Sequence, residues 1–309
     1  MEVVFPQALR AESEFDSTLE FFQKLLRDNS RCHLIDEYPL AFSSQRIENI
    51  FVSKLNNELH AGLVTLEREI EVRKGEWARA LFIGSVVTSP EHRHRGLQRH
   101  LFHSVEETAE KNKIDFLVLW SNQLEFYQKL GFELAGLQAS WIATHRAPLV
   151  RGPSNIRVQV IESSSARLRK EHFESFDKKI CRVKRSFEDM ESLFRIPQMT
   201  IASTERAYAL MGKGEDFAKV CHEWSGPAEE VLACFDALRA VEPAVRILSP
   251  GVLHDADEGL VVQALENASF ENRLEYLGLF KVISDRIDSE KFSPEDLQYP
   301  FFIWGLDSI

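Results

Sequence analysis

Three arginines and a glycine stand together between an apolar segment and an amphipathic one, in a chain that is otherwise acidic. The apolar segment ends at Thr88, and Arg93-His-Arg-Gly-Leu-Gln-Arg99 opens the amphipathic one. The first turn of a helix has backbone N–H groups with no intrahelical partner and a partial positive charge, and a bound diphosphate would satisfy both. Gly96 would let a phosphate approach the main chain closely. The pattern therefore predicts a turn that holds a pyrophosphate group.

The elements around this turn must hold it at the end of a strand. We predict a strand over Trp77–Thr88, closed by Pro90, and a helix over Gly96–Asn112 whose apolar residues recur every four positions. An apolar run of strand length follows at Ile114–Trp120, and a short helix then ends near Gly131. This order is that of an α/β unit with a nucleotide-like ligand at its strand ends. Upstream, we expect a helix at Glu14–Arg27 and strands at Asn49–Lys54 and Glu58–Glu67.

Two motifs resemble those of the GNAT superfamily of acyl-CoA-dependent N-acetyltransferases. The pyrophosphate signature of that family is Gln/Arg-x-x-Gly-x-Gly/Ala. Arg93-His-Arg-Gly96-Leu-Gln98 matches its first and fourth positions but has Gln98 where a small residue is usual. The second motif, Tyr-x-x-x-Gly-Phe, is matched by Tyr127-Gln-Lys-Leu-Gly131-Phe132. Because both motifs occur in this order around a suitably placed helix and strand, residues 1–150 resemble a GNAT domain.

The resemblance implies a role for each matching residue. The fourth and fifth strands would separate, and the pantetheine arm of acetyl-CoA would lie between them. Tyr127 would be the general acid that protonates the leaving thiolate, because a phenol keeps its proton at neutral pH; alternatively, it only packs beneath the cofactor. The N–H of Val86 or Val87 would meet the oxyanion. The cofactor-binding residues implied in this way are Val86, Val87, Thr88, Arg93, His94, Arg95, Gly96, Leu97, Gln98 and Arg99.

The sequence leaves the proton acceptor of such a reaction open. An ammonium ion has no lone pair, so a base must remove a proton before the amine attacks. Many family members carry a Glu on the fourth strand, yet Arg79–Thr88 contains no carboxylate. The candidates that remain are Asp36, Glu37, His222, Glu223 and a terminal carboxylate at Ile309. For each of them, an ordinary structural or surface role is the better expectation than that of the base.

Composition limits the classes of partner. The formal charge of −11 argues against a nucleic-acid binder, which needs a broad basic surface. No apolar run reaches the length of a membrane span and the N-terminus lacks a signal-peptide pattern, so we expect a cytoplasmic protein. The four cysteines show no paired spacing and are expected to be reduced. No metal site is predicted, because arginines that would repel a cation alternate with the clustered histidines His92, His94, His100 and His103.

The second half of the chain repeats the element order of the first. Pro, Gly and Ser concentrate in Arg146–Asn155, which predicts a linker. The repeated order favours a degenerate GNAT-like domain over residues 151–309. Its His222–Pro227 segment has no arginine where the first half has its phosphate turn. We therefore expect the second domain not to bind acyl-CoA, and either to line the acceptor cleft or to stabilise the first domain. The expected elements are strands at Ile156–Ile161, Met199–Thr204, Ala207–Gly212, Phe217–Trp224 and Val245–Leu248, helices at Ala166–Phe176, Phe187–Phe194 and Pro227–Val241, and a final strand within the apolar tail Leu297–Ile309.

The sequence thus predicts a tandem α/β protein with mixed sheets. Its first domain would transfer an acetyl group from acetyl-CoA to a primary amine by direct attack in a ternary complex. The acidic charge mildly favours a cationic small-molecule or peptide acceptor. Two alternatives stay open. One is a non-catalytic acyl-CoA-binding regulatory or interaction protein, which the missing carboxylate favours and Tyr127 disfavours. The other is a transferase of aminoacyl groups from tRNA, which would need a basic groove that the composition does not indicate.

Overall fold

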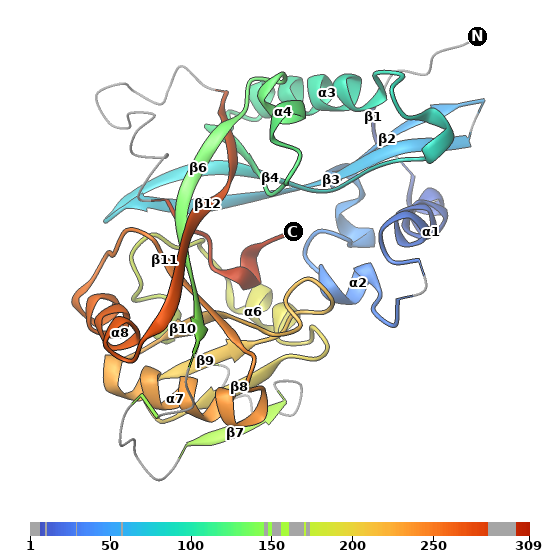
Figure 1. Cartoon of the computed structure of the whole chain (residues 1–309). Coiled ribbons are helices and arrows are strands. Elements are labelled where there is room, and N and C mark those ends of the chain that lie inside the picture. Colours follow the sequence, from blue (N-terminus) through green and yellow to red (C-terminus); the bar gives the residue numbers. More distant parts are fainter. Residues whose placement is uncertain are drawn as a thin grey trace.

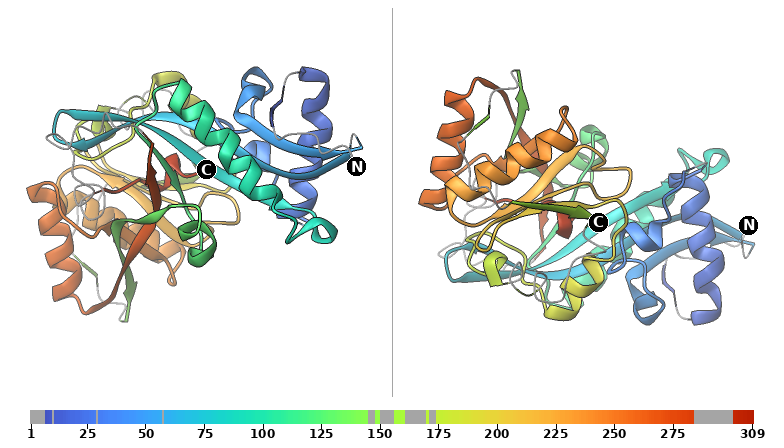
Figure 2. Two further views of the ribbon diagram at one scale, coloured as in Figure 1. Left: turned by 90° about the horizontal axis from the view of Figure 1, so that it is seen from above. Right: turned by 90° about the horizontal axis from the view of Figure 1, so that it is seen from below.

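One mixed sheet runs through both halves of the protein. The computed structural model describes residues 7–283 and 301–309, apart from positions 10, 29, 57, 145–147, 150–155, 161–169 and 171–173. Twelve strands of this part of the chain pair in the order β1-β2-β3-β4-β5-β12-β6-β11-β10-β9-β8-β7. Figures 1 and 2 show the two halves of the sheet curving around a central space in which the C-terminus lies.

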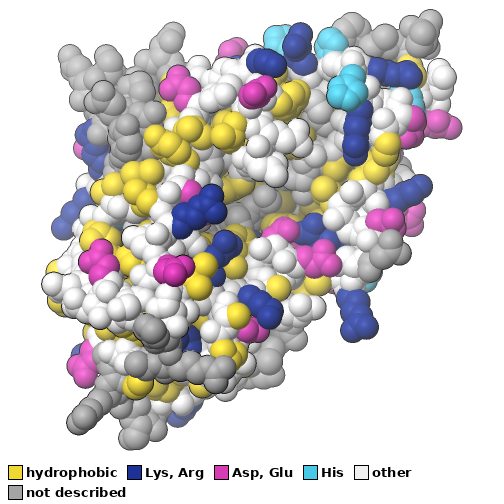
Figure 3. Space-filling model, in the orientation of Figure 1, with side chains coloured by type: hydrophobic (Ala, Val, Ile, Leu, Met, Phe, Trp, Pro, Cys, Tyr) yellow, Lys and Arg dark blue, Asp and Glu magenta, His cyan; other side chains and the backbone are white. Residues whose placement is uncertain are grey.

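The first half has helices on both faces of its strands. Side chains of α3 pack on one face of the strands, and Phe22 of α1 packs on the other. Histidine, lysine and arginine side chains gather along the outer edge of the molecule near α3 (Figure 3). The elements predicted from the sequence for this half are confirmed, and β1, α2 and β6 are additions. The bounds are β1 Gln7–Ala8, α1 Phe15–Leu26, α2 Leu34–Glu37, β2 Ile50–Leu55, β3 Glu58–Arg73, β4 Glu76–Thr88, α3 Leu97–Lys111, β5 Phe116–Leu119, α4 Leu124–Gln128 and β6 Glu133–Ala143.

The second half follows the same order of elements. A parallel pair, β10 with β11, corresponds to β4 with β5, and α7 connects it as α3 connects the first pair. The predicted helix at Ala166–Phe176 and the predicted linker lie largely outside the described residues. Sequence patterns did not predict α8 and β12. The bounds are β7 Arg157–Val160, α6 Phe187–Leu193, β8 Thr200–Ser203, β9 Tyr208–Met211, β10 Val220–Ser225, α7 Ala228–Val241, β11 Arg246–Pro250, α8 Ala256–Asn267 and β12 Phe270–Val282.

The two halves exchange strands at the centre of the sheet. Strand β12 lies between β5 and β6, and β6 lies between β12 and β11. The β6–β12 ladder is antiparallel and long, from the pair Phe270/Ala143 to the pair Phe280/Glu133. Each half therefore contributes a strand that hydrogen-bonds the other. The boundary predicted at residue 150 lies outside the described residues, and the division into 1–150 and 151–309 stays a prediction.

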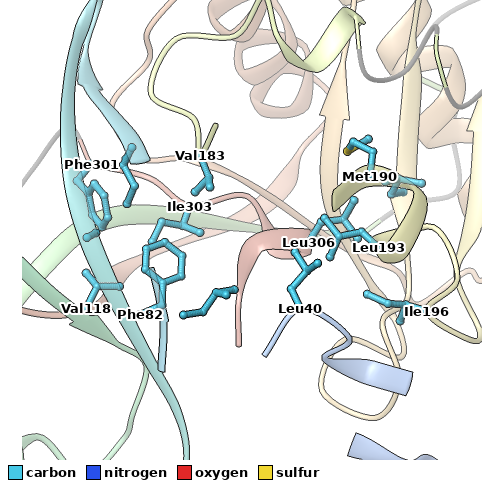
Figure 4. Packing of buried hydrophobic residues seen from close by; sticks show 14 of the residues in the cluster. Leu40, Phe82, Val118, Val183, Met190, Leu193, Ile196, Phe301, Ile303 and Leu306 are labelled. Atoms are coloured by element: carbon cyan, nitrogen blue, oxygen red, sulfur yellow. The ribbon is translucent and has the colours of Figure 1, made fainter. Parts of the chain in front are cut away.

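The tail 301–309 is buried between the two halves. The prediction of a final strand is wrong for this described part, which contains only a 3-10 turn at Gly305–Asp307. Phe301 and Ile303 pack into one hydrophobic cluster, and Phe302 and Trp304 pack into another. Figure 4 shows Phe301 and Ile303 close to side chains from both halves of the chain. The tail fills the space between two sheet faces instead of adding to an edge, so its side chains alternate between the two clusters without a strand partner.

Candidate functional site

Strand β4 extends beyond its neighbour β5. The two strands pair from Ala80/Phe116 to Ile83/Leu119, whereas β4 continues to Thr88. Between its pairs Gly84/Val64 and Val87/Gly62, β4 contains one residue more than β3, and Ser85 has a positive φ of 52°. Such a bulge bends a strand and re-aims its main-chain groups. The last residues of β4 thus have no β5 partner on that side.

Helix α3 begins beside this unpaired end. Its N-cap is Gly96, with a φ of 78° and no side-chain capping hydrogen bond. A Cβ atom built at this position would meet no heavy atom within 4 Å, so the space beside the turn is open. Uncapped N–H groups at a helix start attract an anion. Arg93, Arg95 and Arg99 are exposed around the same turn, which adds positive charge.

A cleft of about 550 Å³ joins these features. All ten cofactor-binding residues predicted from the sequence line it, together with Tyr127. Sequence patterns did not identify five further lining residues, although His92 was noted within the histidine cluster. Leu25 and Leu26 come from the end of α1. The sequence predicted the apolar face of this helix but not that its end lies beside the cleft. The remaining two are Gln123 and Phe126, on either side of the start of α4.

Gln98, which departs from the small residue of the family signature, folds back onto β4. Its side-chain amide donates to the carbonyl of Val87 at 2.5 Å and to Oγ1 of Thr88 at 3.0 Å. Its Oε1 atom is buried and has no hydrogen-bond partner among the described residues. The side chain therefore links the first turn of α3 to the unpaired end of β4, and it already uses one acceptor position of Val87.

Tyr127 is almost fully buried at the wall of the cleft. Its ring meets those of Phe126, Phe102 and Phe132 edge-on, with centroid distances of 5.0, 5.6 and 6.0 Å. Burial raises the pKa of the Tyr127 hydroxyl, and a hydrogen bond with Ser121 opposes that rise. A raised pKa keeps the phenol protonated across the neutral and mildly alkaline range. The geometry agrees with a proton donor and equally with a packing role.

Two base candidates from the first half have different surroundings. Asp36 is exposed to solvent. Glu37 is buried, and its carboxylate accepts hydrogen bonds from Nε of Arg27 at 2.7 Å and from the main-chain N–H of Glu215 at 2.6 Å. Glu37 thus ties α2 to the second half, and both of its carboxylate oxygens already accept a hydrogen bond.

His222 and Glu223 are held in the interior of the second half. Nε2 of His222 lies 2.9 Å from the carbonyl oxygen of Gly212, and burial lowers the pKa of this imidazole to about 3. The carboxylate of Glu223 accepts hydrogen bonds from Arg185 at 2.7 and 3.0 Å and from the hydroxyl of Tyr208 at 2.9 Å. The hydrogen bonds of both residues are made within the protein, which favours a structural role over that of a base.

Ile309, the last base candidate, lies against β4. Its main-chain carbonyl carbon and oxygen are 2.5 Å from the position that a Cβ atom on Gly84 would occupy. Gly84 directly follows Ile83, the last β4 residue that pairs with β5. Only a glycine at this position allows such close approach of another main chain. The tail thus reaches the point where β4 and β5 separate.

The corresponding place in the second half is occupied by side chains of the protein itself. Trp224 lies where β10 and β11 separate, and its indole N–H donates to the carbonyl of Leu248 at 2.8 Å. The carboxylate of Asp257 accepts a hydrogen bond from the N–H of Ala228 at 3.0 Å, in the first turn of α7. A hollow of about 520 Å³ beside it is lined by charged side chains of both signs, namely Glu174, Glu205, Asp255, Asp257 and Glu258 with Lys178, Lys179 and Arg206. The Asp257 carboxylate at the start of α7 would compete with an anion there, which supports the expectation that only the first half holds a diphosphate.

Metal sites and membrane spans are both absent from the described part of the chain. No group of three or more His, Cys, Asp and Glu side chains there lies close enough to hold a metal ion. None of its helices combines the length and the apolar character needed to cross a membrane.

Comparison with known proteins gives one domain match and several structural likenesses. Residues 10–135 match the family model of an acetyltransferase (GNAT) domain. A conserved protein of unknown function from Enterococcus faecalis, described as a probable N-acyltransferase, has 12% identity and a TM-score of 0.66 over 94% of this chain and 75% of its own. A GCN5-related N-acetyltransferase from Anabaena variabilis has 13% identity and a TM-score of 0.65 over 90% and 72%. A tandem GNAT protein from the clavulanic acid biosynthesis pathway has 13% identity and a TM-score of 0.50 over 92% and 99%.

No curated protein sequence matches this chain significantly. The structural likenesses are low in identity and concern the fold, while the family model concerns the half that contains the cleft. Residues 10–135 thus resemble a GNAT acetyltransferase domain, and the chain as a whole shares its fold with these GNAT-related structures.

Proposed function

We propose that this protein is an N-acetyltransferase that moves an acetyl group from acetyl-CoA to a primary amine of a small-molecule or peptide acceptor. The observation that carries the proposal is the single cleft that collects all ten cofactor-binding residues and Tyr127. Its volume is within the usual range for small-molecule sites, about 300–1,000 Å³. The sequence motifs alone could not place these residues around one space.

The cofactor would lie along β4 and end at α3. Main-chain groups of Val86, Val87 and Thr88 have no β5 partner and would pair with the pantetheine amides. The uncapped N–H groups that follow Gly96 would hold the diphosphate, with Arg93 and Arg99 nearby. Because the Gln98 amide already donates to the Val87 carbonyl, pantetheine would share that carbonyl or displace the side chain.

Tyr127 would act as the general acid in this proposal. Direct attack of an amine on the thioester expels a thiolate, and the phenol would protonate it or donate a hydrogen bond to it. Its raised pKa suits the role, since the donor stays intact while the amine acceptor loses its proton. The N–H groups of Val86 and Val87, next to the bulge, would stabilise the oxyanion.

The amine would approach from the side where the tail meets β4. The main-chain carbonyl oxygen of Ile309 lies against Gly84 there and would accept a hydrogen bond from the incoming amine. In a protein that ends at Ile309, this group would be a carboxylate able to take a proton from the ammonium. The net charge of −11 mildly favours a cationic acceptor. The cytoplasmic location inferred from the sequence stays a prediction.

Free-thiol release with a panel of amines tests the proposal. The wild type should release coenzyme A with at least one amine, and Tyr127→Phe should lower kcat while leaving acetyl-CoA affinity unchanged. An unchanged rate would end the acid role of Tyr127. The alternative function, acyl-CoA binding without turnover, is favoured by the Gln98 amide on Val87. Tight acetyl-CoA binding without thiol release on every amine would select this alternative.

A further inference from the structure

A buried lysine of the second half holds the tail. Lys213, in the connection after β9, is 1% exposed. Its Nζ donates to the main-chain carbonyls of Gly305 and Leu306 at 3.1 Å and of Ser308 at 2.6 Å, and it lies 3.1 Å from the hydroxyl of Ser308. One amino group therefore holds three main-chain carbonyls in and just after the 3-10 turn Gly305–Asp307.

Arg185 fixes the same segment through a side chain. Its guanidinium donates to the carboxylate of Asp307 at 2.7, 2.9 and 3.1 Å, and it also binds Glu223 of β10. All three side chains are fully buried. Nη2 of Arg68, on β3 of the first half, lies 3.7 Å from the Asp307 carboxylate. The tail is thus clamped between the two halves from both sides.

The clamp ends at Gly84, close in sequence to Val86, where β4 begins to line the cleft. Ile309 follows Ser308 directly, and its main-chain carbonyl group is the part of the tail that lies against Gly84. The Ile309 side chain packs against two hydrophobic clusters that contain residues of β4, among them Phe82 and Val87. A continuous set of contacts therefore links Lys213 to the place where β4 leaves β5.

Stability alone is a weak reason for an amino group at this place. Burying such a group costs free energy, most of all in its charged form, and an apolar side chain of similar volume is often equally stable or better. Within the described residues, no carboxylate forms a salt bridge with Lys213. Its acceptors are the main-chain carbonyls of the tail and one hydroxyl. This geometry fixes the direction of a backbone, which an aliphatic side chain cannot do.

We propose that Lys213 is a positioning residue for the transfer reaction, and that the second half serves catalysis by holding residues 305–309 against Gly84. This inference rests on the proposed function, because the tail matters for turnover only if the thioester lies along β4. Lys213 touches neither cofactor nor acceptor in this account. It acts through the main-chain group of Ile309, which must lie where the amine attacks.

The test compares Lys213→Met with a matched control. Methionine keeps an unbranched apolar stem and removes the three donors. The control is Lys54→Met on β2, which removes a partly buried lysine whose partner, Glu14, is remote from the tail. For both variants and the wild type, kcat and KM are measured by thiol release, acetyl-CoA affinity by calorimetry, and hydrogen exchange at the amides of residues 305–309.

Lys213→Met should lower kcat at least tenfold, leave the acetyl-CoA dissociation constant within twofold, and speed exchange in residues 305–309. The control should match the wild type in all three. A purely structural role would lower the melting temperature without changing kcat per folded molecule, and that result would overturn the inference. If Lys213→Met does not fold, Ser308→Ala removes one acceptor of Lys213 and should lower kcat about threefold with faster exchange in the tail; unchanged values would overturn the inference.

The controls separate this inference from the proposed function. A wild type that releases thiol with an amine while the Lys213 and Ser308 variants keep its kcat refutes only the positioning role. A wild type that binds no acetyl-CoA refutes the proposed function, and the inference falls with it.

Discussion

Gly84→Ala tests the contact between the tail and β4 directly. A Cβ atom at this position would lie 2.5 Å from two main-chain atoms of Ile309 and 3.0 Å from Cγ1 of its side chain. Ordinary contacts begin at about 3.4 Å, so the tail must move by roughly 0.9 Å. The atoms in the way are main chain and are held by Lys213 and Arg185, so they cannot rotate aside.

The expected cost follows from this displacement. A misplacement of about 1 Å near reacting groups can cost about 10²-fold in rate. We expect kcat of Gly84→Ala to fall between about tenfold and 10²-fold, with acetyl-CoA affinity within twofold of the wild type. Overpacking should also lower the free energy of unfolding by about 1–3 kcal/mol.

The assay is steady-state thiol release with the best amine of the panel, beside a thermal melt. Gly259→Ala in α8 is the control, since a Cβ atom there would meet only Cδ1 of Leu253, at 4.0 Å. That variant should keep kcat and gain about 0.5–1 kcal/mol, because Ala is the better helix former. If Gly84→Ala keeps kcat within twofold despite a lower melting temperature, the tail has no part in the reaction and the reasoning is refuted.

Three other predictions follow from the same structure. Tyr127→Phe should lower kcat by about 10²-fold. In the wild type, the loss of activity caused by deprotonation of Tyr127 should occur above the ordinary tyrosine pKa, because burial raises the pKa of this hydroxyl. A Tyr127→Phe variant with the wild-type pH–rate profile would contradict the acid role. Burial lowers the pKa of Lys213 to about 7 from 10.5, so between these values the unfolded chain binds the extra proton and stability rises with pH. The difference in unfolding free energy between wild type and Lys213→Met should therefore increase by up to about 1.4 kcal/mol per pH unit from about pH 7 to pH 9, and a flat difference in denaturant melts would contradict it. A fragment of residues 1–150 lacks β12 (Phe270–Val282), the strand between β5 and β6, so it should show no cooperative melt on its own; a fragment that melts cooperatively would contradict the need for strand exchange.

Local patterns predicted most elements of the fold because the periodicities along the chain are strong. The four-residue apolar repeat of α3 and the continuous apolar run of β5 each appear within one window of sequence. Strands β6 and β12 were not predicted. Many positions of β12 are exposed, and its long partner lies in the other half of the chain, so no local signal marks it.

The cleft was partly predictable for a different reason. Its phosphate turn is a contiguous segment, so the sequence places Arg93–Arg99 together without help from the fold. The contact of Ile309 with Gly84 joins residues that are far apart in the sequence. The hydrogen bonds of Lys213 depend on the path of a tail whose sequence has no helical or strand periodicity. The tail was expected to be a strand because it is apolar and aromatic. A strand also needs a partner edge, which the space between the halves does not offer.

Similarly, the sequence could not separate surface carboxylates from buried ones. Glu37 and Asp36 are neighbours in an ordinary polar segment, yet Glu37 is enclosed by Arg27 and the main chain at Glu215. One of these partners, Glu215, comes from the second half, and this contact is visible only in three dimensions.

The central claim is that the first turn of α3 holds the diphosphate of acetyl-CoA. A crystal structure of the protein with saturating acetyl-CoA measures this most directly. The account predicts diphosphate oxygens within hydrogen-bond distance of the N–H groups that follow Gly96, and pantetheine along Val86–Thr88. A cofactor bound elsewhere, or a cleft that stays empty at saturating concentration, would contradict it.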